Sequence, residues 1–152
     1  MRELHFLVMV VGTLLLPLPA GAVDSLKYEV LDKKPQERRN FVQGLEIVDG
    51  KLYVSSGNYG QSRLMRYNFE DMSLEVSKQL NRRLFAEGVT VLHERVYQLT
   101  WRERMMLVFD KRNLDYVEWF PIPGEGWGLT NDGEHLIYSD GSDRLHFLSP
   151  DD

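Results

Sequence analysis

The hydrophobic and polar positions of the chain form a pattern that recurs three times. In each repeat a glycine is followed by a short apolar strand, a polar turn and a second apolar strand, and a third strand comes after these. The three glycines are Gly44, Gly88 and Gly128. Repeats of about 40–45 residues with four strands each are typical of the blades of a β-propeller. The pattern therefore predicts an all-β fold, a β-propeller with four-stranded blades.

The predicted blades begin near residues 41, 85 and 126. A polar turn separates the first two strands of each blade, and in the first blade this turn holds Asp49-Gly50, a strong signal for a β-hairpin. The first two repeats offer a fourth strand, whereas the third repeat stops after its third strand. Propellers usually need four or more blades to close a ring. We therefore expect about three blades in a chain that is truncated at its C-terminus.

Residues 1–22 have the features of a secretory signal peptide. The apolar run 6–16 is too short for a transmembrane helix, and Ala20-Gly21-Ala22 is a suitable cleavage site. The alternative is an uncleaved anchor. We expect a mature partial propeller domain over residues 23–152, in a secreted or periplasmic location. Within it, residues 26–31 alternate between apolar and polar, which predicts an N-terminal strand that closes the ring.

Composition narrows the choice of partners and cofactors. The chain has 18 basic and 23 acidic side chains and a net charge of −5, which argues against nucleic acid or an anionic membrane as the main partner. There is no cysteine, so a disulfide framework, a thiolate nucleophile and a cysteine-based zinc site are excluded. The histidines at 93, 135 and 146 show no ligand spacing, and the sequence predicts no metal site.

The residues directly before the three glycines are the candidates for a functional site. They are Gln43, Glu87 and Trp127. The first strand of each propeller blade lines the central channel, so equivalent positions of successive blades are expected to point at one axial site. The alternative is that these three are unrelated residues at the rim of the fold, because clustered polar groups need partners.

Glu87 is the candidate acid and base. A single carboxylate can serve both roles when apolar surroundings raise its pKa toward neutrality, and Phe85 and Trp101 are placed to supply them. Trp101 stands where the other two repeats carry Gly57 and Gly141, which indicates the wall of a pocket. The alternative for Trp101 is packing in the core.

Three further residues are interpreted separately from this scheme. Glu125 is a second acid near the axis and the alternative to Glu87 for the catalytic role. Tyr59 lies in a loop rich in glycine, serine and asparagine, and we interpret it as a loop aromatic rather than a rim contact. Trp119 falls on an expected outer strand, and we interpret it as packing between blades.

Several motifs together closely resemble one family. They are FVQGL, DGKLYVSSGNYGQSRL, FAEGVT, VYQLTW and GEGWGLTNDGEHLIYSDGSDRL, and the resemblance extends over about residues 26–152. The family is the plant and bacterial type of glutaminyl cyclase, also called glutaminyl-peptide cyclotransferase or glutamine cyclotransferase. The resemblance implies a secreted five-bladed β-propeller that converts the N-terminal glutamine of peptides or proteins to pyroglutamate and releases ammonia. It also implies that no catalytic metal or other cofactor takes part.

The resemblance assigns roles to residues already singled out and adds one. The catalytic acid and base falls on Glu87, and substrate binding falls on an amide and four aromatic residues: Phe41, Gln43, Phe85, Trp101 and Trp127. The family continues into further blades, which bring an asparagine and a lysine to the pocket, and this chain stops before either. We expect the complete protein to be a monomer. The alternative function is a non-catalytic secreted β-propeller that binds a partner, or an inactive truncated remnant.

Overall fold

The structure, a computed structural model, describes residues 25–150. Two compact units are distinguished, residues 1–33 and residues 34–152, and every strand of the described residues lies in the second. The predicted signal peptide falls outside the described residues. Within them, no helix is long and apolar enough to span a membrane.

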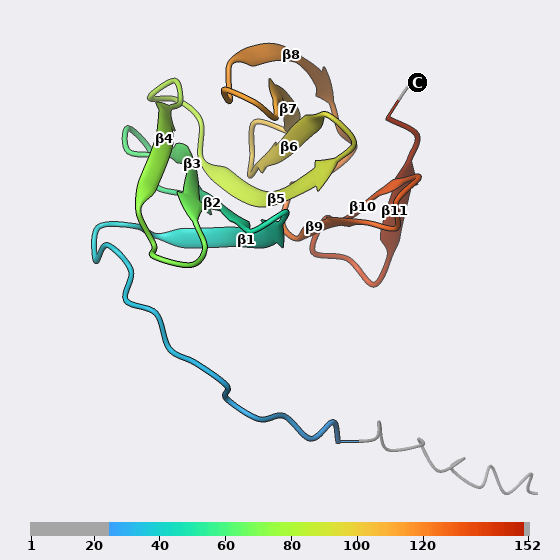
Figure 1. Ribbon diagram of the computed structural model, residues 1–152. Coiled ribbons are helices and arrows are strands. Elements are labelled where there is room, and N and C mark those ends of the chain that lie inside the picture. The colour runs from blue at the N-terminus through green and yellow to red at the C-terminus, as the bar shows by residue number, and fades with distance from the viewer. Residues whose placement is uncertain (1–24, 151–152) are drawn as a thin grey trace, which may run out of the picture. The chain divides into compact units, whose positions relative to one another are not determined.

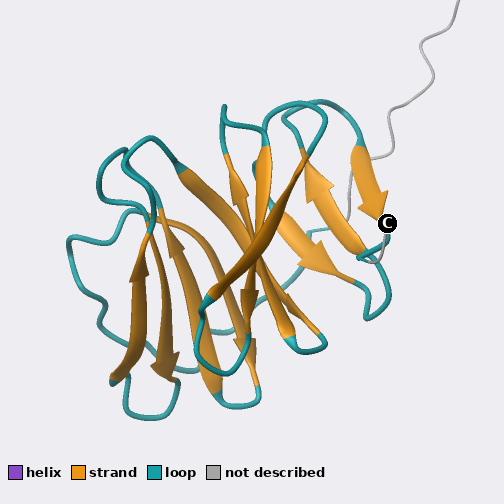
Figure 2. Cartoon of the chain, turned by 90° about the horizontal axis from the view of Figure 1, so that it is seen from above, coloured by secondary structure: helices purple, strands orange, loops and turns teal. Residues whose placement is uncertain are grey.

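Residues 42–148 form three antiparallel sheets, each with its strands in chain order (Figures 1 and 2). The first sheet holds β1 (Val42–Val48), β2 (Lys51–Ser56), β3 (Arg63–Asn68) and β4 (Leu74–Gln79). The second holds β5 (Ala86–Leu92), β6 (Arg95–Thr100), β7 (Met105–Asp110) and β8 (Tyr116–Pro121). The third holds β9 (Leu129–Asn131), β10 (Leu136–Ser139) and β11 (Leu145–Leu148). The prediction of an all-β fold is confirmed, with four strands in the first two repeats and three in the third.

The tight turns between strands follow from local sequence. β1 and β2 pair up to Val48 and Lys51, so only Asp49 and Gly50 form the loop. Both have positive φ angles, 52° and 70°, as a type I′ turn requires. In the second sheet the equivalent two-residue loop uses His93, which takes a φ of 54° without being glycine. The β-hairpin that Asp49-Gly50 predicted is therefore confirmed, with the turn type whose twist matches that of the two strands.

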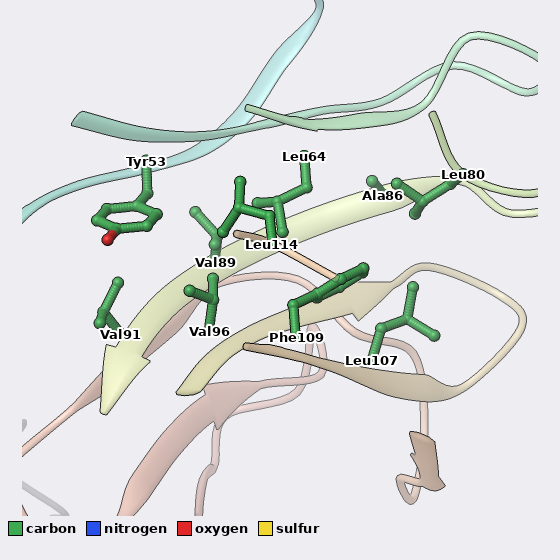
Figure 3. Packing of buried hydrophobic residues seen from close by; sticks show 10 residues of the cluster. All are labelled: Tyr53, Leu64, Leu80, Ala86, Val89, Val91, Val96, Leu107, Phe109 and Leu114. Carbon is green, nitrogen blue, oxygen red and sulfur yellow. The ribbon is translucent and has the colours of Figure 1, made fainter. Parts of the chain in front are cut away.

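Strands β5, β6 and β7 of the second sheet are buried on both faces because their side chains alternate between the two neighbouring sheets. Val96 and Phe109 belong to the cluster shared with the first sheet, where Figure 3 shows them opposite Tyr53 and Leu64. The residues in between face the third sheet and pack with Leu136 and Tyr138: Tyr97, Leu99, Met106 and Val108. This period of two explains why β5, β6 and β7 are buried along nearly their whole length, polar residues such as Thr90 and Gln98 included.

Glycines let the first strands of the three sheets approach one another (Figure 1). A Cβ atom at Gly44 would lie 2.7 Å from the backbone nitrogen of Val89, and one at Gly88 would lie 2.5 Å from that of Leu129. The backbone N–H of Gly88 also donates to the carbonyl of Trp127 at 2.8 Å. The repeated glycine of the sequence is therefore the point at which β1, β5 and the start of the third sheet pack backbone to backbone.

Two expectations differ from the structure. Residues 26–31 form no strand, and Leu26 and Tyr28 are about nine-tenths exposed, at 91% and 89%. Alternation alone does not make a strand, because the backbone needs a hydrogen-bonded neighbour. Trp119 lies on β8 but is not buried between sheets, since it is 49% exposed on a strand whose residues are all exposed except Phe120.

Candidate active site

Gln43 and Glu87 both sit in β-bulges. The register of β1 passes from Val42 paired with Ser56 to Gly44 paired with Ser55, which leaves Gln43 as the extra residue. On β5 the register shifts in the same way across Glu87 and Gly88, between the pairs made by Ala86 and Val89. A bulge leaves one residue out of the ladder and re-aims its side chain. The equivalent bulges direct both side chains to the inner edge of the sheets.

The two side chains meet. Gln43 Nε2 donates a hydrogen bond of 2.9 Å to Glu87 Oε2, although 44 residues separate them. Glu87 is only 4% exposed. Burial raises the pKa of Glu87 to about 6, the hydrogen bond from Gln43 opposes this rise, and the negative charge of Glu125 adds to it. A carboxyl group in this range can be ionised or protonated near neutral pH.

Five aromatic rings contact one another in a continuous set, and we call them the aromatic row: Phe41, Tyr59, Phe85, Trp101 and Trp127. Phe41 and Phe85 precede Gln43 and Glu87 by two residues each. Phe85 is the centre of the row. Its ring lies 6.2 Å from Phe41, 5.3 Å from Tyr59 and 5.5 Å from Trp101, each measured between centroids. Trp101 continues to Trp127 at 6.1 Å. All four contacts are edge-to-face, the geometry that aromatic pairs favour.

Glycines at the ends of neighbouring strands make room for the row. A Cβ atom at Gly57 would lie 2.6 Å from Cε1 of Phe85, and one at Gly141 would lie 3.1 Å from Nε1 of Trp127. Trp101, the counterpart of these glycines in the second sheet, is partly exposed and contacts rings of the row. This geometry favours the interpretation of Trp101 as a pocket wall over packing in the core.

Tyr59 was not expected to belong to the site. Besides its contact with Phe85, its hydroxyl donates to Glu103 Oε1 at 2.9 Å, and Glu103 Oε2 accepts from the backbone N–H of Phe85 at 3.2 Å. The sequence carried one signal for this role, because Tyr59 follows Gly57 closely in the loop between β2 and β3. Only the fold shows that this loop reaches the start of β5.

Trp127 contacts the site through its ring and its backbone, whereas Gln43 contacts it through its side-chain amide. Its ring is 40% exposed and contacts Trp101, whereas its backbone carbonyl accepts the hydrogen bond from Gly88, next to Glu87. The structure thus brings together all six residues predicted for the site, Gln43 and Glu87 directly and the aromatic residues through the row. Their roles in catalysis and substrate binding stay predictions.

Glu125 is placed differently from Glu87. It is partly exposed, and its Oε2 accepts a hydrogen bond from Trp101 Nε1 at 2.8 Å. The more exposed acid is engaged with an indole, and the buried acid faces an amide, which favours Glu87 as the carboxyl that exchanges protons. In the described part of the chain, residues 25–150, no group of three or more His, Asp or Glu side chains is arranged to hold a metal ion.

Successive antiparallel sheets, two of four strands and one of three, pack their inner strands closely in the manner of β-propeller blades. With the buried Glu87 carboxylate on an inner strand, they define a β-propeller with a carboxylate site. A β-propeller domain from Myceliophteria thermophila matches this fold with a TM-score of 0.57 at 6% identity, covering 74% of this chain and 36% of that one. At that identity the similarity concerns the fold alone.

The chain belongs to the glutamine cyclotransferase family, whose sequence model matches residues 6–152. A glutaminyl-peptide cyclotransferase of Arabidopsis thaliana is 33% identical over 124 residues, which are 80% of this chain and 39% of that protein. The crystal structure of Myxococcus xanthus glutaminyl cyclase matches with a TM-score of 0.71 and 30% identity, over 81% of this chain and 52% of the other. The resemblance noted from the motifs is confirmed, and the chain spans about half or less of these two relatives.

Proposed function

We propose that the protein encoded by this gene is a glutaminyl-peptide cyclotransferase that uses Glu87 as its single acid and base. The observation that carries this proposal is the buried Glu87 carboxyl, hydrogen-bonded to Gln43 and two residues after Phe85 of the aromatic row. Family membership supports the reaction class. The substrates are peptides or proteins that begin with glutamine, which become pyroglutamyl peptides with release of ammonia.

The reaction needs one proton acceptor that later becomes a donor. The free α-amine of the substrate attacks its own γ-carboxamide carbon, and the new C–N bond closes a five-membered lactam. The Glu87 carboxylate takes the proton that the amine loses. The resulting carboxylic acid then gives this proton to the departing nitrogen, so that ammonia leaves as the C–N bond of the carboxamide breaks. A carboxyl group with a pKa of about 6 suits both steps near neutral pH.

The remaining residues of the site act on conformation and solvent. Attack is intramolecular, so holding the glutamine side chain in a folded conformation lowers the barrier. The aromatic row offers flat apolar walls for the methylene groups of this side chain, and its rings exclude water. Gln43 keeps the Glu87 carboxylate oriented through the bond to Oε2. A metal ion has no part in this scheme.

The test uses a synthetic peptide with N-terminal glutamine and the protein as its gene encodes it. Mass spectrometry should find a product that has lost one ammonia, and a coupled assay should detect free ammonia in equal amount. The matched control is the same peptide with an acetylated N-terminus, which lacks a free amine and should not react. The assay is repeated after exhaustive chelation, and turnover should persist. A protein that binds the peptide without releasing ammonia is a binding module, and the proposal fails.

A further inference from the structure

Glu125 makes two contacts around one ring of the aromatic row. Its Oε2 accepts the hydrogen bond of 2.8 Å from Trp101 Nε1. Its Oε1 lies 3.8 Å from Nε of Arg102, and the Arg102 guanidinium stacks over the Trp101 ring, 3.9 Å from its centroid. One face of the indole is therefore covered by a cation, and its N–H is bound by a carboxylate from the segment that leads into β9.

The backbone on both sides of Glu125 is tightly fixed. The N–H of Gly126 donates to the carbonyl of Trp101 at 3.2 Å, and a Cβ atom at Gly126 would lie 2.5 Å from the carbonyl oxygen of Thr100. Gly124 has a φ of 75°, and a Cβ atom there would lie 3.1 Å from the side chain of Asp140. Only glycine fits the close approach at position 126, and the positive φ favours glycine at position 124. The backbone of Glu125 is consequently held at a fixed place beyond the end of β6, from which its carboxylate reaches Trp101.

The indole of Trp101 depends on this anchor. Its other neighbours in the row, Phe85 and Trp127, touch it by edge-to-face contacts, which restrain a ring less strongly than a hydrogen bond to a charged acceptor. Without Glu125 the indole N–H loses its acceptor, and only the weaker contacts with Phe85, Trp127 and Arg102 restrain the ring. A wall displaced by about 1 Å is enough to slow a reaction that depends on substrate conformation.

We propose that Glu125 is a positioning residue of this site: it holds the Trp101 indole as a fixed wall and does not itself exchange a proton with the substrate. The inference rests on the proposed function in so far as Trp101 contacts the substrate. The charge of Glu125 also contributes to the raised pKa of Glu87, after burial. Glu125 therefore acts on the reaction through two neighbours, one geometric and one electrostatic.

The first experiment needs no enzyme activity. The indole Nε1–H of Trp101 is followed by ¹⁵N NMR in the parent, in Glu125→Ala and in Glu125→Gln. We expect Glu125→Ala to shift this resonance and speed its hydrogen exchange on the order of tenfold, because a bond to a charged acceptor is lost. Glu125→Gln keeps an acceptor oxygen and should exchange at nearly the parent rate. Glu118→Ala, on the exposed outer strand β8, is the matched control and should change nothing. An unchanged resonance in Glu125→Ala overturns the proposal.

The second experiment is a double-mutant cycle on kcat/KM for a peptide with N-terminal glutamine. Glu125→Ala should lower kcat/KM about tenfold in the parent background. In the Trp101→Phe background the ring has no N–H to hold, so the same substitution should have a clearly smaller effect, the part that acts through the pKa of Glu87. If Glu125→Ala lowers kcat/KM by the same factor in the parent and in the Trp101→Phe background, the proposal is overturned. If the parent itself cyclises no such peptide, the proposed function fails, and the indole measurement still decides whether Glu125 positions Trp101.

Discussion

At the scale of single residues, the surroundings of one carboxyl group decide what the site can do. Glu87 is buried, and its pKa of about 6 lets the carboxyl group both accept and release a proton near neutral pH. Glu125 is partly exposed and contacts Trp101 and Arg102. Gln43 stabilises the ionised form of Glu87 by hydrogen bonding, and burial favours the protonated form. The balance between these effects keeps both forms of Glu87 accessible near neutral pH.

The substitution Glu87→Gln separates the two acids. It keeps the size and hydrogen bonding of the side chain but removes the proton acceptor. We expect a loss of cyclisation rate on the order of 10²–10⁴, with peptide affinity within a few-fold of the parent. Glu125→Gln should keep its rate within a few-fold. The measurement is ammonia release at saturating peptide, with folding checked by circular dichroism. An active Glu87→Gln beside an inactive Glu125→Gln would move the catalytic role to Glu125.

The pKa of Glu87 gives a second prediction. Carboxyl NMR should find a midpoint near pH 6 for Glu87, and Gln43→Met should move it higher because the hydrogen bond that favours the carboxylate is lost. Since the folded-state pKa lies above the ordinary value of 4.5, the stabilisation that Glu87 contributes is fully present below that value and is lost as pH rises through about 6. Urea unfolding at several pH values should show this loss in the parent and not in Glu87→Gln. A midpoint near 4.5 would contradict the burial argument.

At the scale of elements, the inner strands are positioned by glycines and bulges acting together. The bulges on β1 and β5 aim Gln43 and Glu87 at the same place, and the close backbone approach at Gly44 and Gly88 brings their sheets within reach of each other. A larger residue at either glycine would meet backbone atoms of the next sheet first, and it would push the sheets apart. The geometry of the site is thus a property of strand packing.

Gly88→Ala tests this packing against a matched glycine. A Cβ atom at Gly88 meets backbone atoms of Leu129 and Trp127 at 2.5 Å and 2.6 Å, whereas one at Gly128 meets only the Ser139 hydroxyl at 3.2 Å. We expect Gly88→Ala to cost about 3 kcal/mol of unfolding free energy. Gly128→Ala should stay within about 1 kcal/mol of the parent, because the side chain of Ser139 can move and alanine restricts the unfolded chain. Urea denaturation of both variants provides the measurement, and equal costs would refute the packing argument.

At the scale of the whole molecule, the two outer sheets carry apolar side chains on the faces turned away from the central sheet. On β1, Glu46 bonds to the second sheet through the N–H of Val91, and the alternate residues Leu45 and Ile47 are 56% and 49% exposed. On β11, Leu148 packs toward the second sheet, and Leu145 and Phe147 are 64% and 59% exposed. Such faces are typical of surfaces that associate.

These faces predict how the chain of 152 residues behaves on its own. We expect it to self-associate at micromolar concentration, because apolar faces and open strand edges gain by covering one another. Sedimentation velocity should show species larger than a monomer, and Leu145→Lys with Phe147→Lys should reduce them. Exposed Val117→Lys on β8 is the control. A monodisperse parent monomer with a cooperative melt would show that the three sheets suffice, in contradiction to this prediction.

Export is a further prediction for the whole chain. The apolar run 6–16 and the small residues at 20–22 lead us to propose cleavage and a secreted or periplasmic location. Mass spectrometry of the protein recovered outside the cytoplasm should find an N-terminus at or near Val23. A protein that still begins at Met1 would show that the segment is an uncleaved anchor or no signal at all.

The sequence by itself determined the repeat, and the tertiary structure decided what the repeat brings together. Alternation of apolar and polar residues, the Asp49-Gly50 turn and the recurring glycines are local signals, so strands, hairpins and the shared register of Gln43 and Glu87 could be predicted from them. The place of Tyr59 beside Phe85, the bond between Trp101 and Glu125, and the exposure of Trp119 could not. Each depends on contacts between segments far apart in the chain. Residues 26–31 show that a local pattern is not sufficient, because they alternate like a strand but have no hydrogen-bonded neighbour and form none.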